Sequence, residues 1–134
     1  GAVEWLTPAA DDEHWDLIEG QGSLFHASYA GVSLGLLHGA QADALVMCHE
    51  PTRTHMRGLP DAALPGLAEC IALNERCGRL TNAACRVVGI SVNTAAFDVG
   101  GAERVLRGIE DETGLPTVDA YRQGAGRLVD ALHS

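Results

Sequence analysis

The stretch DLIEGQGSLFH, residues 16–26, organises the expected architecture of the chain. A short apolar run over residues 15–18 ends in an acid, two glycines, a hydroxyl and an imidazole. We interpret residues 15–18 as a buried strand, closed by glycines whose missing Cβ permits a tight turn or the close approach of a ligand. Ligands of open parallel sheets bind at the carboxyl ends of strands. The polar and glycine residues at this end are Glu19, Gln21, Gly22, Ser23 and His26.

The same pattern recurs later in the chain. Residues 43–48 form a continuous apolar run of strand length, residues 86–92 (RVVGISV) are predicted as a further strand, and both segments are followed by polar residues. Helical spacing of apolar residues over 28–38 and 66–80 separates these runs, and residues 51–66 have three prolines and no apolar period, which predicts an irregular loop.

The C-terminal third carries further helix and strand signals. Asp98 can cap a helix that Gly114 ends, a short strand follows at 115–118, and the last helix runs through Leu132. Strands joined through helices require right-handed crossovers and therefore a parallel sheet. The sequence thus predicts the α/β class, with flanking helices on a parallel sheet.

Composition limits the possible partners. The 134 residues suit one domain with a hydrophobic core, and 18 acidic against 9 basic residues give a net charge of −9 that disfavours nucleic acid and anionic membrane surfaces. No apolar run approaches the roughly 20 residues that cross a bilayer, and the first residues lack a signal-peptide pattern, so we expect a cytoplasmic protein. The four cysteines lack CxxC or zinc-ligand spacing, which favours buried free thiols.

Five motifs carry a resemblance to a known family: IEGQGSLFH, SYAGVSLGLLHG, DALVMCHEPTRTHMRGLP, VVGISVNT and IEDETGLPTVD. Together they resemble the C-terminal P-loop-like domain of a formerly uncharacterised family that includes the D-glutamate N-acetyltransferases. The resemblance covers essentially the whole chain. It implies a P-loop NTPase-like fold lacking the first strand and the phosphate loop, since no GxxxxGK[ST] occurs. Residues 1–134 would then be a single, partial domain, the C-terminal part of a larger two-domain protein.

The resemblance also implies an activity. The parent protein would transfer an acetyl group from acetyl-CoA to the amine of a D-amino acid such as D-glutamate, as a homo-oligomer or in association with the missing N-terminal part. One alternative is an ATP- and Mg-dependent ligase or kinase-like enzyme, because the layout is also similar to that of dethiobiotin synthetase. In that comparison Glu19 would hold magnesium and Asn93 would contact a base. A second alternative is a non-catalytic ligand-binding or assembly domain.

Amine acetylation requires a base, and the candidates are His49, Glu19 and then His26. Histidine titrates near neutrality, although a lone histidine is more often structural. Glu19 alternatively accepts hydrogen bonds from the backbone of the turn that follows it. A zinc site is a weaker alternative, because Pro51 prevents the helical HExxH arrangement; its ligands would be His26, His49, His55 and Glu50.

Binding of the substrate requires cations and polar groups. Arg53 and Arg57 could grip a carboxylate or phosphate bidentately, or could form surface ion pairs in a solvated loop. The other candidate substrate-binding residues are Gln21, Gly22, Ser23, Glu50 and Arg122. Ser23 and Asn93 have a second interpretation as residues that satisfy the backbone of a turn.

Overall fold

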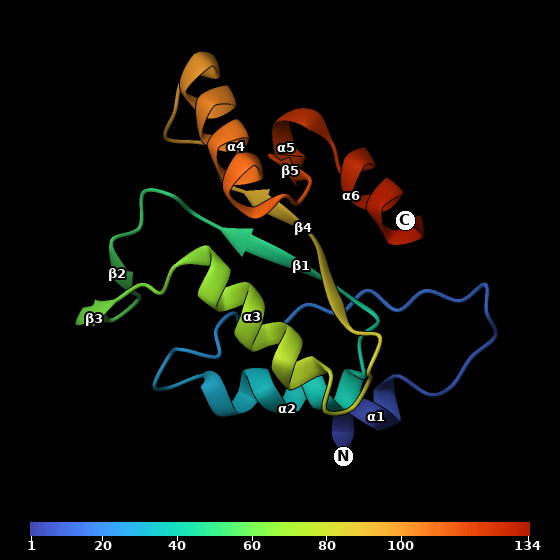
Figure 1. The fold of residues 1–134 in the computed structure, drawn as a ribbon. Coiled ribbons are helices and arrows are strands. Elements are labelled where there is room, and N and C mark those ends of the chain that lie inside the picture. The colour runs from blue at the N-terminus through green and yellow to red at the C-terminus, as the bar shows by residue number, and fades with distance from the viewer.

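The computed structural model describes residues 1–134 and shows an α/β fold built on a three-stranded parallel sheet (Figure 1). The strands are β1 (Ala44–His49), β4 (Arg86–Val92) and β5 (Thr117–Val118), in the order β1-β4-β5. Met47 lies opposite Ile90, and Ser91 lies opposite Val118. Because all three strands are parallel, their carboxyl ends meet at one edge of the sheet. The predicted fold class is confirmed.

Helices cover both faces of this sheet. The helices are α1 (Ala2–Leu6), α2 (Ala30–Ala40), α3 (Leu67–Gly78), α4 (Val99–Thr113), α5 (Ala120–Gln123), α6 (Gly126–Asp130) and the 3-10 helix η1 (Ala131–His133). Ile90 packs in one buried cluster with Leu106 of α4, and Ile71 of α3 lies against that cluster. The neighbouring position, Gly89, points to the opposite face and approaches Leu128 of α6.

The predicted boundaries of α4 are confirmed by its two caps. The Asp98 side chain accepts a hydrogen bond from the Gly101 N–H at 2.6 Å, which satisfies one of the free amides of the first turn. Gly114 ends the helix in the left-handed conformation, with φ 69°. No helix of the chain combines the length and the apolar character that a bilayer crossing requires.

The prediction of an irregular loop over residues 51–66 is wrong. Two short antiparallel strands, β2 (His55–Met56) and β3 (Leu59–Ala63), form a hairpin there. Gly58 has φ 75°, which allows the two-residue turn between the strands. Pro60 lies within β3 without disrupting it, because each strand of a two-stranded sheet has one edge that needs no backbone donor.

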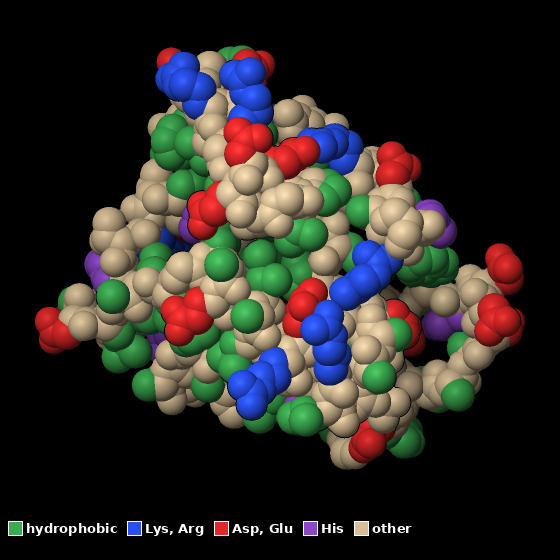
Figure 2. Space-filling view, in the orientation of Figure 1, with side chains coloured by type: hydrophobic (Ala, Val, Ile, Leu, Met, Phe, Trp, Pro, Cys, Tyr) green, Lys and Arg blue, Asp and Glu red, His purple; other side chains and the backbone are tan.

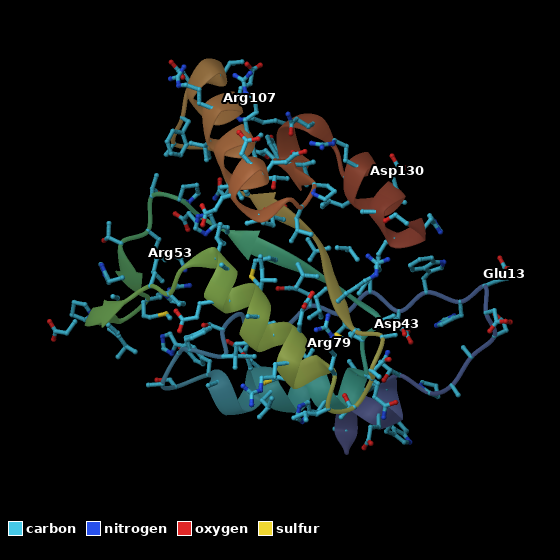
Figure 3. The ribbon with its side chains drawn as sticks, in the orientation of Figure 1. Glu13, Asp43, Arg53, Arg79, Arg107 and Asp130 are labelled. Carbon is cyan, nitrogen blue, oxygen red and sulfur yellow. The ribbon has the colours of Figure 1, made fainter.

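The prediction of a first strand at residues 15–18 is also wrong. Residues 14–23 contain neither helix nor strand, and the Leu17 side chain is 94% exposed. In Figure 3 Glu13 lies at the outer end of this segment, away from the sheet. A strand needs a neighbour to bond its backbone, and residues 15–18 pair with no strand of the sheet, although β1 is an edge strand with one side open.

Candidate functional site

A cavity of about 570 Å³ lies at the carboxyl ends of the parallel strands. Its walls come from the ends of β1 and β4, the loop that leads into the hairpin, the start of α3 and the junction between β5 and α5. Apolar residues such as Met47, Val92 and Leu67 line part of it. The polar residues of the lining include Ser23, His49, Glu50, Arg53, Ser91, Asn93 and Asp119. The polar residues that follow the apolar parts of β1 and β4 therefore lie in one cavity.

His49 is the last residue of β1, and its carbonyl accepts a hydrogen bond from the Asn93 N–H at 2.9 Å. This bond continues the parallel ladder and places the two residues at neighbouring strand ends. Burial lowers the pKa of His49 below 6.5, while the charges of Glu112 and Glu50 act in the opposite direction. The imidazole is therefore mainly neutral at pH 7 and has a lone pair that can take a proton.

Glu50 and Arg53 form an ion pair at the rim of the cavity. Arg53 Nη2 donates to Glu50 Oε2 at 2.7 Å, and both side chains keep more than a third of their surface exposed. Arg57 is exposed and is not among the residues of the lining. The structure therefore does not bring Arg53 and Arg57 together at the cavity, and only Arg53 is placed to contact a ligand there.

Except for His26, the site residues predicted in the stretch 16–26 lie in two separate depressions of the structure. Gly22 and Ser23 line the cavity with His49, and Ser23 Oγ accepts a hydrogen bond from the Phe25 N–H at 3.1 Å, which closes a turn. Glu19 and Gln21 instead line a separate depression beside α1 and α2. Because the strand expected at 15–18 is absent, Glu19 is not delivered to the edge of the sheet where His49 lies.

His26 has a structural arrangement in this fold. It is 6% exposed, its Nδ1 accepts a hydrogen bond from the Ser28 N–H at 3.1 Å, and its Nε2 donates to the Arg57 carbonyl at 2.9 Å. The ring lies 4.4 Å from that of Tyr29, centroid to centroid. Both nitrogens are engaged, so His26 has no lone pair for a substrate proton and instead ties the hairpin to the segment before α2.

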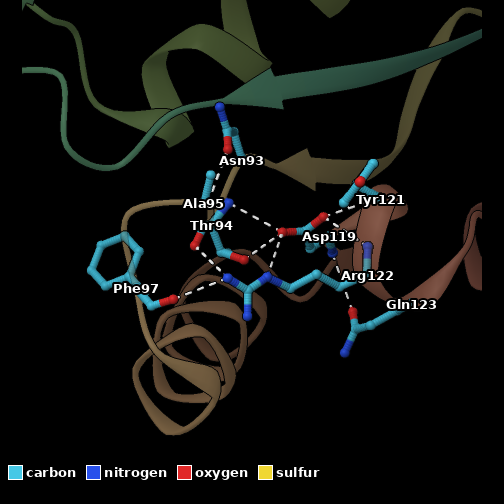
Figure 4. Close-up of polar contacts among 8 residues, drawn as sticks. All are labelled: Asn93, Thr94, Ala95, Phe97, Asp119, Tyr121, Arg122 and Gln123. Carbon is cyan, nitrogen blue, oxygen red and sulfur yellow. Dashed lines mark hydrogen bonds and ion pairs between the residues drawn. The ribbon is translucent and has the colours of Figure 1, made fainter.

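Asp119 is a site residue that the sequence interpretation did not select. It is 4% exposed, and Oδ1 accepts hydrogen bonds from the N–H groups of Tyr121 at 3.0 Å and Arg122 at 3.2 Å (Figure 4). Oδ2 accepts from the Thr94 N–H at 3.2 Å and from the Thr94 hydroxyl. Burial alone raises the pKa of Asp119, but these hydrogen bonds outweigh it and the net pKa is lowered. Its position directly after an apolar strand and before a helix was the signal available in the sequence.

Arg122 and Asn93 complete this network. Arg122 Nη2 donates to the carbonyls of Thr94 at 3.3 Å and Phe97 at 3.0 Å, so its guanidinium holds the loop after β4 and does not line the cavity. Asn93 does line the cavity, and its Oδ1 accepts from the Ala95 N–H at 3.0 Å. The turn interpretation of Asn93 is thus confirmed, and its Nδ2 remains able to donate to a ligand.

Comparison with known proteins places this geometry in a family. A family model described as "Domain of unknown function (DUF1611_C) P-loop domain" matches residues 1–129. The chain belongs to the DUF1611_C family. The DUF1611_C domain is 58% identical over 132 residues to a D-glutamate N-acetyltransferase of Tritonibacter scottomollicae, and 49% identical over 132 residues to a protein of the same name from a Pseudoalteromonas species.

These alignments cover different shares of the proteins compared. Each includes 98% of this DUF1611_C chain but 40% of the relative, so the chain spans about 40% of the length of the curated relatives it matches. The crystal structure of a DUF1611 family protein from Anabaena variabilis ATCC 29413 matches with a TM-score of 0.79 and 38% identity, over 86% of this chain and 34% of that chain.

Metal ligands are not grouped in this DUF1611_C domain. No group of three or more His, Cys, Asp or Glu side chains lies close enough together to hold a metal ion, so the histidines and Glu50 considered for zinc do not form a zinc site. Magnesium is commonly held by one or two carboxylates together with substrate phosphates, so a magnesium role for Glu19 stays a prediction. The four cysteines are free, and Cys48 is exposed in the cavity wall where the sequence pattern predicts a buried thiol.

Proposed function

We propose that the full-length protein is an N-acetyltransferase that moves an acetyl group from acetyl-CoA to the amine of a D-amino acid such as D-glutamate. The observation that carries the proposal is the identity of 58% and 49% to two proteins of that name along nearly the entire domain. The cavity at the strand ends supports it, because its polar residues include a neutral base, a cation and a free amide donor.

In the proposed reaction His49 takes a proton from the substrate ammonium group. The neutral amine then attacks the thioester carbonyl, and the new N–C bond forms. As the C–S bond breaks, the acylated nitrogen loses its extra proton, and the leaving CoA thiolate takes up a proton and departs as the thiol. Placing amine and thioester side by side makes the attack effectively unimolecular. His49 suits this role because its lowered pKa keeps the imidazole neutral at the pH where it must accept a proton.

Other residues of the cavity would bind the two substrates. Arg53 would contact a carboxylate of the amino acid, with Glu50 holding the guanidinium in place through their 2.7 Å bond. The Asn93 amide would donate to the base of CoA. Backbone N–H groups at Gly22 and Ser23, which line the same cavity, would face the thioester oxygen as negative charge develops on it. Arg53 is the one Arg or Lys side chain of the lining, so the CoA phosphates would be bound mainly by residues outside this domain.

A thiol-release assay on the full-length protein tests the proposal. Purified enzyme should release free CoA thiol from acetyl-CoA only when a D-amino acid is present, and the release should fall steeply for His49→Gln. ATP hydrolysis without thiol release would instead establish the ATP-dependent alternative. Absence of both activities would favour a binding or assembly domain.

We also propose that this domain is covered in the full-length protein by its remaining residues or by a second copy. The chain exposes 8723 Å², whereas a compact 14.1 kDa monomer exposes about 6,700 Å². Figure 2 shows hydrophobic side chains at the surface across the middle of the molecule, and Trp5 and Leu17 are 82% and 94% exposed. A well-behaved monomeric 134-residue species in sedimentation experiments would contradict this proposal.

A further inference from the structure

We propose that Asp119 is a positioning residue that fixes the Asn93 amide at the rim of the cavity by holding the loop 93–97 against the start of α5. The inference rests on the proposed function for the identity of the ligand, a nucleotide such as CoA. Asp119 would affect ligand binding through the loop and Asn93, without contacting the ligand itself.

Asp119 joins two separate walls of the cavity. Its Oδ1 accepts the N–H groups of Tyr121 and Arg122, so it caps α5. Its Oδ2 accepts both the N–H and the hydroxyl of Thr94, which follows β4. One carboxylate thus sets the distance between the end of β4 and the start of α5 (Figure 4).

The loop 93–97 has little freedom to adopt another conformation. Arg122 holds the carbonyls of Thr94 and Phe97, and its Nε lies 3.7 Å from Asp119 Oδ2. Thr94 itself is fully buried. The Asn93 Oδ1 is bonded to the Ala95 N–H within the same loop, so the orientation of the Asn93 amide follows the position of the loop.

Only a carboxylate can accept the backbone N–H donors on both sides, those of α5 at one oxygen and that of Thr94 at the other. In Asp119→Asn the amide oxygen can still cap α5, because Asn caps helices about as well as Asp. The amide NH₂ would then face the Thr94 N–H, and two donors cannot bond each other. This substitution therefore releases the loop while it retains the helix cap, which separates positioning from general folding.

The test measures ligand affinity on the full-length protein by calorimetry. CoA and 4′-phosphopantetheine, which lacks the base, are titrated into wild type, Asp119→Asn, Asn93→Ala and the double variant. We expect Asp119→Asn to weaken CoA by about 2- to 12-fold, the range of one neutral hydrogen bond, and to leave 4′-phosphopantetheine unchanged. In the Asn93→Ala background the same substitution should have no further effect on CoA.

Two controls and a second measurement complete the design. Asp111→Asn removes the same charge from an exposed position of α4 and should leave both affinities unchanged, and Thr94→Ser should retain wild-type affinity because it keeps the hydroxyl. Amide hydrogen exchange over residues 93–97 should accelerate in Asp119→Asn while β1 stays protected.

The outcomes separate this inference from the proposed function. Equal weakening of both ligands, or additive effects of Asp119→Asn and Asn93→Ala, would overturn the positioning role. If wild type binds neither ligand, the proposed function fails, and the exchange experiment still decides the inference. Unchanged exchange over residues 93–97 would overturn it even then.

Discussion

A methyl group added at Gly89 would meet β5 and α6 at once. The Cβ of alanine at this position would lie 2.4 Å from Leu128 Cδ2 and 2.9 Å from the carbonyl oxygen of Pro116. The end of the Leu128 side chain can rotate away, but the Pro116 carbonyl belongs to the backbone and accepts the Ile90 N–H at 2.9 Å. Gly89→Ala must therefore push β5 away from β4.

Overpacking of this kind costs about 1–3 kcal/mol, which corresponds to a change of about 5- to 140-fold in the equilibrium for opening β4 from β5. Asp119 follows β5 directly, so the same displacement moves the carboxylate that holds the loop 93–97. We expect Gly89→Ala to weaken CoA binding in addition to destabilising the sheet.

Amide hydrogen exchange at Ile90 measures the first effect, because its N–H bonds across to the chain segment of β5. Gly108→Ala is the matched control: this position lies in the middle of α4 with nothing within 4 Å, and alanine there should stabilise the helix by about 0.5–1 kcal/mol. Adding Leu128→Ala to Gly89→Ala should cost less than Leu128→Ala alone, since it removes the shorter clash. Unchanged exchange at Ile90 in Gly89→Ala would refute the reasoning.

Three further predictions concern ionisable side chains. His49→Gln should lower kcat by about 10²–10⁴-fold and abolish the acid limb of kcat/KM, which in wild type should lie below pH 6.5; a limb that survives in the variant would exclude His49 as the base. Arg53→Ala should raise KM for a dicarboxylic amino acid far more than for a neutral one, whereas Arg57→Ala should change neither, and equal losses for both substrates in Arg53→Ala would remove the clamp role. The pKa of Asp119 lies below the usual 3.8, so its ionised form stabilises the fold above that pH and the contribution disappears as the pH falls through the lowered value. The stability difference between wild type and Asp119→Asn, followed by circular dichroism, should therefore shrink on acidification, and a constant difference would contradict the assignment.

Elements whose signals are local could be predicted from the sequence. The strand at 86–92 matches β4, because its mainly apolar, β-branched residues are typical of a strand buried on both faces. Helix α4 carries its own start and stop signals in Asp98 and Gly114. The strand predicted at 43–48 differs by one residue at each end from β1, which runs from Ala44 to His49.

Elements that depend on distant partners could not be predicted in this way. The run at 15–18 has a strand-like composition but no neighbour along the sheet, and its side chains stay exposed. The hairpin at residues 55–63 shows the opposite case. The short turn at Gly58 brings β3 back to pair with β2, but the prolines of this region obscure the alternation of apolar residues that would indicate strands.

The residues of the candidate site show the same difference between local signals and dependence on distant partners. His49, Glu50 and Asn93 lie at the cavity because their strands are locally encoded and a parallel sheet brings strand ends together. Glu19 was assigned to a strand end that does not form, and Arg122 turns back to bond the loop after β4. Residue type and spacing do not specify in which direction a long side chain turns. The sequence therefore could not distinguish side chains that line the cavity from those that bond the protein elsewhere.

The enclosed ring of His26 offers a spectroscopic reporter that requires no label. Its Nε2–H is held by the Arg57 carbonyl inside the fold, and such imidazole protons exchange slowly enough with water to give a resolved downfield proton resonance. The bond spans from the segment before α2 to the hairpin, whose Met56 lines the cavity. A chemical-shift change of this single proton during a titration would therefore register movement of the hairpin wall when a ligand enters.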